Sequence, residues 1–146
     1  MLRGHARAKV DSKGRLKIPA EFLEPFLELS GDTRRVFVTS RDGKRALVYP
    51  LPVWQEHERK ILEIPSTVPQ VEAYVRTTGF WGRESGVDAN GRILIHPLLR
   101  EWAAVNGDVS VFGRQEILEV CNFEMFRHQP PVMGPEDLAA LSQYGI

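Results

Sequence analysis

The chain has little sulfur and no long apolar run, and both absences narrow the class of protein. Its 146 residues include one cysteine, Cys121, which excludes an internal disulfide and a thiolate metal cluster. Such cysteine usage is typical of a reducing cytoplasm. No apolar stretch approaches the roughly 20 residues of a membrane-spanning helix. The basic N-terminus has no apolar segment typical of a signal peptide, so we expect a cytoplasmic protein.

Net charge is also absent, because 19 basic residues balance 19 acidic ones. The two signs are nevertheless distributed unevenly. Residues 1–17 carry six basic side chains and one acidic one, whereas residues 116–146 carry five acidic side chains and one basic one. This asymmetry predicts a local basic working surface with an acidic region elsewhere. The alternative is that both ends are merely solvated.

Motifs of common enzymes and metal sites are missing. None of the four histidines, His5, His57, His96 and His128, stands at metal-ligand spacing from another histidine or from the cysteine. The sequence has no P-loop, dinucleotide fingerprint, G-x-S-x-G elbow or clustered carboxylates. We therefore expect no enzyme activity, no metal and no cofactor. Cys121 falls at the end of a predicted strand, where buried packing is the favoured role.

What the chain does contain is an internal repeat. Residues 10–19 read VDSKGRLKIP, and residues 87–97 read VDANGRILIHP. Two copies are too few for a solenoid, so they predict two similar half-domains that share one core. The two copies are 77 residues apart, and their matched positions are Asp11 and Asp88, Gly14 and Gly91, Arg15 and Arg92, and Ile18 and Ile95.

Each copy is predicted to be a hairpin. The turns DSKG and DANG suit tight hairpins, because Asp bonds the backbone two residues on and Gly takes positive φ without steric cost. Pro19 and Pro97 end the outgoing strands and lead into short helices. A second hairpin and a second helix then complete each half, giving β-β-α-β-β-α twice. The apolar run Ile93–Ile95 predicts that the second outgoing strand is buried on both faces.

These elements predict an α+β fold, mainly β with short helices. We expect a first repeat over residues 1–66, a linker helix and second repeat over 67–129, and a proline-rich tail over 130–146. The linker helix is expected at about 69–77. The tail holds one short helical pattern, at 135–143, and is expected to be partly mobile.

The pattern D-x-x-G-R places an arginine on the first residue of the outgoing strand, beside a compact turn. Its guanidinium is a planar, permanently charged fork suited to phosphate or to a guanine edge. The aspartate either fixes the turn or holds the arginine, and for one copy a purely structural role explains the motif equally well. Two copies and the basic flank favour anion binding. Lys13 stands where the second turn has Asn90, so the first copy is predicted to bind anions better.

Three stretches together resemble the MraZ family. They are MLRG before VDSKGRLKIP, LVYPLPVWQE at residues 47–56, and VDANGRILIHPLLR at residues 87–100. The resemblance covers residues 1–128 and implies a bacterial DNA-binding transcriptional regulator. The implied fold is a pseudo-two-fold β-barrel of two AbrB-like (SpoVT-AbrB, swapped-hairpin) domains. The resemblance also implies ring-shaped homo-oligomers that bind direct DNA repeats and repress the division and cell-wall gene cluster, including their own promoter.

The resemblance carries functional roles onto matching positions. Those positions are Arg3, Gly4, Asp11, Lys13, Gly14 and Arg15 in the first half, and Asp88, Gly91 and Arg92 in the second. Lys9 and Lys17 flank the first motif, so the predicted DNA-binding set is Arg3, Lys9, Lys13, Arg15, Lys17 and Arg92. We expect the lysines to contact phosphates, and Arg3 and Arg15 to reach base edges. The glycines and aspartates are expected to shape the motif and its turns.

The sequence departs from the family in three places, one of which is Ile95-His96-Pro97, where the family usually has a proline run. The family commonly has arginine twelve residues after the first motif's aspartate, where this chain has Leu23, although the second copy has Arg100. Phe80–Trp81 is an unusual pair before the second motif. We expect Trp54, Trp81 and Trp102 to be core or subunit-contact residues rather than platforms for bases.

A protein-interaction module is the alternative function. The swapped-hairpin fold also forms the dimerising part of antitoxins, and the acidic C-terminal third offers a surface for a protein partner. The doubled motif and the basic N-terminus favour DNA instead, and with it an association with the nucleoid.

Overall fold

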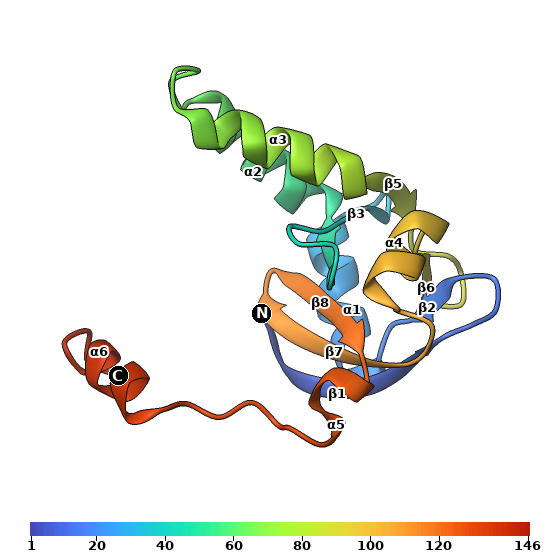
Figure 1. The fold of residues 1–146 in the computed structure, drawn as a ribbon. Coiled ribbons are helices and arrows are strands. Elements are labelled where there is room, and N and C mark those ends of the chain that lie inside the picture. The colour runs from blue at the N-terminus through green and yellow to red at the C-terminus, as the bar shows by residue number, and fades with distance from the viewer.

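Eight strands form one antiparallel sheet whose order interleaves the two halves of the chain. The computed structural model describes residues 1–146, and in it the order is β5-β3-β4-β8-β7-β1-β2-β6 (Figure 1). A bridge between Val87 and Ile93 joins the end of β5 to β6 and brings the sheet close to a closed barrel. The strands are β1 (Leu2–Val10), β2 (Arg15–Lys17), β3 (Arg35–Thr39), β4 (Ala46–Pro50), β5 (Arg83–Gly86), β6 (Arg92–Leu94), β7 (Gly107–Gln115) and β8 (Ile117–Asn122).

Strand pairing exchanges the first strand of each half. β1 pairs with β7 from the second half, with Leu2 opposite Gln115 and Val10 opposite Gly107. β5, the counterpart of β1, pairs in the same way with β3 from the first half. The equivalent strands β2 and β6 pair with each other, as do β4 and β8. This swapped pairing confirms the predicted double-hairpin barrel of two β-β-α-β-β-α halves with pseudo-two-fold symmetry.

The helices cover the barrel and extend from it. They are α1 (Ala20–Ser30), α2 (Leu51–Leu62), α3 (Pro69–Trp81), α4 (Pro97–Ala103), α5 (Glu124–Arg127) and α6 (Pro135–Ser142). Proline opens or precedes α1 and α4, where a residue without an N–H is tolerated. α2 and α3 form a helical hairpin that projects from the barrel (Figure 1). None of the helices has the length and apolar content needed to cross a membrane.

Both halves contribute to one hydrophobic core of 20 buried residues. Leu16 of β2 lies opposite Ile93 of β6, and both are fully buried. Burying such a side chain contributes about 1.5–3 kcal/mol. The prediction that Ile93–Ile95 is buried on both faces is wrong, because Leu94 is 47% exposed. β6 alternates instead, since the outer face of the β2–β6 pair is open to solvent.

The linker helix and the tail complete the chain. α3 runs four residues further than the predicted end at residue 77, and Thr39 anchors it by donating its hydroxyl to the Thr78 carbonyl oxygen (2.7 Å). After α5 the chain leaves the barrel, and α6 stands apart from it (Figure 1). No residue of α6 is buried.

Candidate nucleic-acid interface

The carboxylate of Asp11 organises the first turn. Its Oδ1 accepts the backbone N–H groups of Lys13 and Arg15, both at 2.9 Å, and its Oδ2 accepts Nε–H of Arg15 at 3.1 Å. The N–H of Arg15 is the main cause that lowers the pKa of Asp11 below its ordinary value. Gly14 donates its N–H to the Asp11 carbonyl oxygen (2.9 Å) and has φ of 83°, which favours glycine.

The second turn repeats this backbone pattern. Oδ1 of Asp88 accepts the N–H groups of Asn90 (2.8 Å) and Arg92 (3.0 Å), and the latter is the main cause of a lowered Asp88 pKa. Gly91 has φ of 73° and donates to the Asp88 carbonyl oxygen (3.0 Å). The side-chain contacts differ, however, because Nη1 of Arg92 lies 3.9 Å from Oδ2 of Asp11. Asp11 therefore lies between the arginines of both motifs.

Backbone hydrogen bonds join the two turns directly. Ile18 donates its N–H to the Gly91 carbonyl oxygen at 3.0 Å, and Ile95 donates to the Gly14 carbonyl oxygen at 2.8 Å. Lys17 adds a third link, because its ammonium group donates to the carbonyl oxygen of Asn90. The two repeats in the sequence thus form a single paired structure, in which each turn is held by the opposite half.

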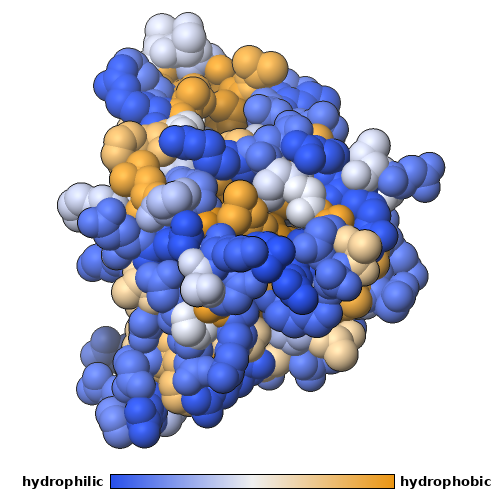
Figure 2. Space-filling view, turned by 90° about the vertical axis from the view of Figure 1, so that its right-hand side faces the viewer, coloured by the Kyte–Doolittle hydropathy of each residue, from blue (hydrophilic) through white to orange (hydrophobic).

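The outer face of β2 and β6 carries three basic side chains. Arg15 and Lys17 come from β2, and Arg92 comes from β6. The side chains of Arg15 and Arg92 are about one-third exposed, and Lys17 is exposed. Leu94 occupies the position that matches Lys17, so the first half supplies more of the charge. Figure 2 views the molecule from the side where these strands lie, and hydrophilic residues dominate the middle of that face.

Strand β1 carries a basic strip on its exposed face. Alternate residues point outward along the strand, so Arg3, His5, Arg7 and Lys9 are all exposed. Arg7 is engaged within the chain, because it pairs with Asp108 at 2.8 Å and its guanidinium lies 4.1 Å from the centre of the Phe123 ring. Arg3 and Lys9 make no side-chain hydrogen bond or ion pair, and their charges are available to a partner.

The remaining predicted positions divide into two groups. Lys13 lies exposed at the tip of the first turn, without a partner for its ammonium group. Gly4 lies within β1 rather than in a turn, opposite Gly113, and has φ of 91°. The structure therefore brings Lys13, Arg15, Lys17 and Arg92 together around the paired turns, while Arg3 stands at the far end of β1.

The second half has no comparable strip. The residues that match Arg3 and Lys9, 77 positions later, are Phe80 and Gly86. Phe80 is 57% exposed and packs against Trp81, which in turn contacts Trp102. The barrel is thus pseudo-symmetric in its backbone and asymmetric in its surface charge.

One contact was not anticipated from the sequence. The guanidinium of Arg100, on α4 of the second half, covers Gly14 of the first turn, whereas Leu23 on α1 of the first half covers Gly91. Nε of Arg100 is buried without a hydrogen-bond partner. Leu23 and Arg100 are matched positions, so the sequence revealed the difference. It did not reveal that each side chain covers the turn of the opposite half.

Among the other residues that the sequence singled out, Trp54 is 7% exposed and stacks on Phe37 with 4.5 Å between ring centres. Trp54 is therefore a core residue. Trp102 is 67% exposed and lies outside the core, so its expected role in a subunit contact stays a prediction. Cys121 is buried, and burial raises the pKa of its thiol to about 11. A thiol protonated at neutral pH fits packing and not nucleophilic chemistry.

Two interleaved halves with a doubled D-x-x-G-R turn define a double swapped-hairpin barrel of the SpoVT-AbrB class. Residues 1–77 match the profile of a family described as "MraZ protein, putative antitoxin-like". The chain belongs to the MraZ family.

Full-length relatives agree with this assignment. The chain is 41% identical to the transcriptional regulator MraZ of Acidobacterium capsulatum over 148 aligned residues, which cover 100% of both chains. It is 34% identical to the protein of the same name from Koribacter versatilis, again over 100% of both. The MraZ of Acidithiobacillus ferrooxidans is 36% identical over 82% of each chain. These relatives are named for transcriptional regulation and not for an enzymatic reaction.

Proposed function

We propose that the chain binds double-stranded DNA in a sequence-specific manner, mainly through its first hairpin. The observation that carries this proposal is the exposed face of β1 and its turn, where Arg3, Lys9 and Lys13 have no partner within the chain. A two-stranded β-ribbon fits the major groove of B-DNA, where base pairs differ in their pattern of donors and acceptors. The second hairpin lacks this strip and mainly supports the first.

The contacts within the turns support a separate proposed role for each basic side chain. Lys9 and Lys13 contact phosphates, which sets the position of the hairpin on the duplex. Arg15 has its Nε held by Asp11, so its orientation is fixed while its two Nη groups remain free to donate to a base edge. Arg3 is the second base-contacting candidate. Lys17 and Arg92 add positive charge and also link the two turns.

Several copies of the chain are needed for tight binding, because one hairpin offers few contacts. We propose a ring-shaped homo-oligomer on direct DNA repeats, since cyclic symmetry presents successive subunits in the same sense. Its targets are the division and cell-wall gene cluster and its own promoter, where it acts as a repressor on the nucleoid in the cytoplasm. The division into residues 1–66, 67–129 and 130–146 is part of the same proposal.

Fluorescence anisotropy with DNA from upstream of the chain's own gene tests this function across a salt series. The wild-type chain is expected to prefer that DNA over a scrambled duplex. Arg15→Ala is expected to lose about tenfold or more of the preference, because one bidentate base contact is worth about 1–3 kcal/mol. Arg92→Ala tests whether the second hairpin contacts DNA directly or only stabilises the first hairpin. Arg76→Ala is the matched control, since Arg76 is exposed on α3 and pairs only with Glu72.

An antitoxin-like module that binds a protein is the second candidate, and it is favoured by the match to a family described as antitoxin-like. Weak, sequence-blind DNA binding that disappears at moderate salt in all four chains would leave only a nonspecific phosphate contribution. A simple dimer by light scattering that co-purifies with another protein would then support the second candidate.

A further inference from the structure

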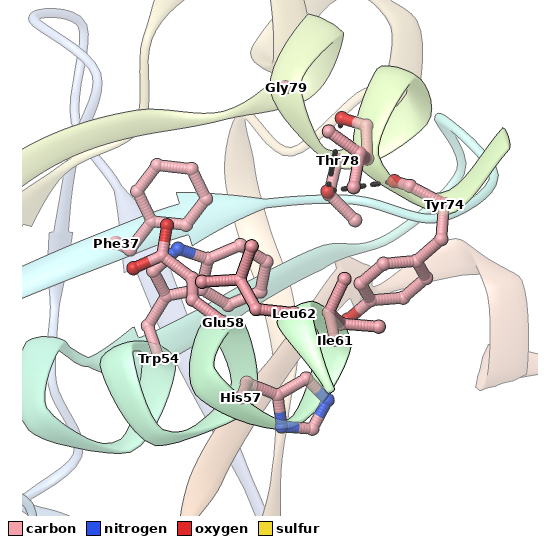
Figure 3. A pocket seen from close by; sticks show the side chains of 10 residues that line it. Phe37, Trp54, His57, Glu58, Ile61, Leu62, Tyr74, Thr78 and Gly79 are labelled. Atoms are coloured by element: carbon pink, nitrogen blue, oxygen red, sulfur yellow. Dashed lines mark hydrogen bonds between the residues drawn. The ribbon is translucent and has the colours of Figure 1, made fainter. Parts of the chain in front are cut away.

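An apolar groove lies between the two helices of the helical hairpin. Its volume is about 450 Å³, and its floor is formed by Phe37, Trp54 and Tyr74 (Figure 3). Leu62 and Val75 stand at its edges, 84% and 54% exposed. No other part of the chain covers this groove, although apolar surface of this kind marks binding sites in soluble proteins.

The C-terminal tail presents the complementary apolar residues without any packing of its own. Its exposed large side chains include Leu138 (56%), Leu141 (36%), Tyr144 (74%) and Ile146 (81%). Leu138 and Leu141 are three residues apart and share one face of α6. An isolated helix of eight residues is marginal in water, so α6 needs a surface against which its apolar face can pack.

Charge also matches the two surfaces. After Arg127 the tail contains no lysine or arginine, and it carries the acidic residues Glu136 and Asp137. His57 lines both this groove and a second cavity, which is also lined by Arg41, Lys60 and Arg114 and has Glu116 as its single carboxylate. Lys60 makes no ion pair within the chain. Glu58 is the one acidic residue in the apolar groove itself.

The linker that precedes α6 directs the tail away from its own barrel. Pro130 and Pro131 lie between α5 and α6, and consecutive prolines favour an extended, semi-rigid chain. Figure 1 shows the tail leaving from α5 and α6 standing far from the α2–α3 hairpin in that view. A tail that cannot easily fold back is suited to reach a neighbouring molecule.

We propose that residues 132–146 of one copy dock into the α2–α3 groove of a second copy. Leu138 and Leu141 fill the apolar floor, and the acidic groups of the tail face Arg41 and Lys60. The groove shares no residue with the paired turns, so docking can be tested in chains whose proposed DNA-binding residues are unchanged.

Cross-linking between whole chains that each carry one introduced cysteine beside native Cys121 tests the docking. Leu62→Cys and Leu138→Cys chains are mixed and oxidised with copper–phenanthroline, so that only a contact between copies yields the mixed disulfide. Native Cys121 is buried, so the wild-type chain measures the background level of cross-linking. Glu101→Cys replaces Leu62→Cys in the matched control, because Glu101 is exposed on α4 and does not line the groove. We expect a covalent dimer from the first mixture, which is lost when Val75→Glu is added to the Leu62→Cys chain.

Three results would overturn the proposal. The first is a yield no higher than that of the Glu101→Cys control. The second is a dimer that persists with Val75→Glu in a chain whose thermal unfolding is unchanged. The third is a link within one chain of the double variant Leu62→Cys, Leu138→Cys without any link between copies. DNA anisotropy on the same chains is measured separately, so that failure of docking is distinguished from failure of DNA binding.

Discussion

The guanidinium of Arg100 lies over Gly14, where a β-carbon on the glycine would come within 2.5 Å of its Cζ and Nε atoms. A side chain from the second half therefore covers the turn that the first half is proposed to place on DNA. The matching contact of Leu23 with Gly91 is looser, at 3.3 Å. This pair of contacts makes the two turns unequal in their sensitivity to substitution.

Gly14→Ala is expected to destabilise the fold by about 1–2 kcal/mol through its positive φ, and also to displace Arg100. Urea unfolding of Gly14→Ala, Arg100→Ala and the double variant measures the coupling between the two residues. We expect the double variant to lose less than the sum of the single losses. Strict additivity would show that Arg100 does not restrain the turn. Gly91→Ala is the control, because Gly91 also has positive φ but its neighbouring side chain, Leu23, can move aside.

Removal of the motif carboxylates should affect the two turns differently. Asp11→Ala removes an acceptor of two backbone N–H groups and also frees Arg15, whereas Asp88→Ala removes only backbone contacts. Both variants are expected to unfold at a lower temperature, and Asp11→Ala at the lower of the two. Equal melting temperatures would mean that the Asp11–Arg15 pair contributes nothing measurable. Asp11→Asn, which retains an oxygen acceptor, should recover part of the loss.

The tip of the first turn carries Lys13 and the tip of the second carries Asn90, so exchanging the two residue types tests which turn contacts DNA. Lys13→Asn is expected to reduce the salt dependence of DNA binding by about 0.9 in the slope of log K against log salt, because one phosphate contact is lost. Asn90→Lys makes the matching change in the second turn. If the second hairpin also contacted DNA, the slope for Asn90→Lys would steepen by a similar amount. We expect no such change, because we propose that DNA binds the first hairpin. Anisotropy titrations at four or more salt concentrations measure both slopes.

Because the two halves share one core, truncating a buried side chain in either half is expected to destabilise both halves together. Leu16→Ala and Ile93→Ala each remove a fully buried side chain from the β2–β6 pair, at an expected cost of about 2–5 kcal/mol. Each variant should still unfold in one transition, seen alike by circular dichroism and by tryptophan fluorescence. Two separated transitions would show that the halves have independent cores. Leu94→Ala, on the exposed face of the same strand, is the control and should change stability little.

His96 predicts a loss of stability in mild acid. Burial, together with the nearby charges of Arg83 and Arg100, holds its pKa below the ordinary value of about 6.5. The unfolded chain therefore binds a proton more readily than the folded chain, so the free energy of unfolding decreases as pH falls below about 6.5. Nε2 of His96 lies 2.6 Å from the Trp81 carbonyl oxygen, a contact that fixes the end of α3.

Chemical denaturation of the wild-type chain and His96→Gln at pH 7.5 and pH 5.5 measures this contribution. The variant is expected to lose less stability between the two pH values than the wild type. His57→Gln is needed beside it, because burial also lowers the pKa of His57. An identical decrease in the wild type and in His96→Gln would assign the pH dependence to other groups.

The sequence predicted what depends on short-range chemistry. The hydrogen bonds of both turns follow from Asp and Gly at fixed offsets, and Pro19 and Pro97 marked the starts of two helices. Leu94 was misjudged because three apolar residues in a row do not reveal which face of a strand is covered. That depends on the partner strand, and its outer face here carries Arg15 and Lys17.

Long-range contacts of the site were beyond the reach of local patterns. The cover of Gly14 by Arg100 depends on the exchange of strands between the halves, which brings α4 beside a turn 86 residues earlier in the sequence. The engagement of Lys17 by Asn90 has the same origin. A spacing of 77 residues identifies matching positions, whereas only the pairing of strands shows which side chains meet.

Interleaved pairing also sets the time at which the regulator becomes competent during its synthesis. β1 ends at Val10, but its partner β7 begins at Gly107, so the ribosome must add almost 100 residues before the two can meet. At about 5–20 residues per second, the nascent basic strand waits about 5–20 s for its partner. A message cut short before β7 therefore yields a chain whose proposed DNA-binding hairpin lacks the strand that pairs along the whole of β1.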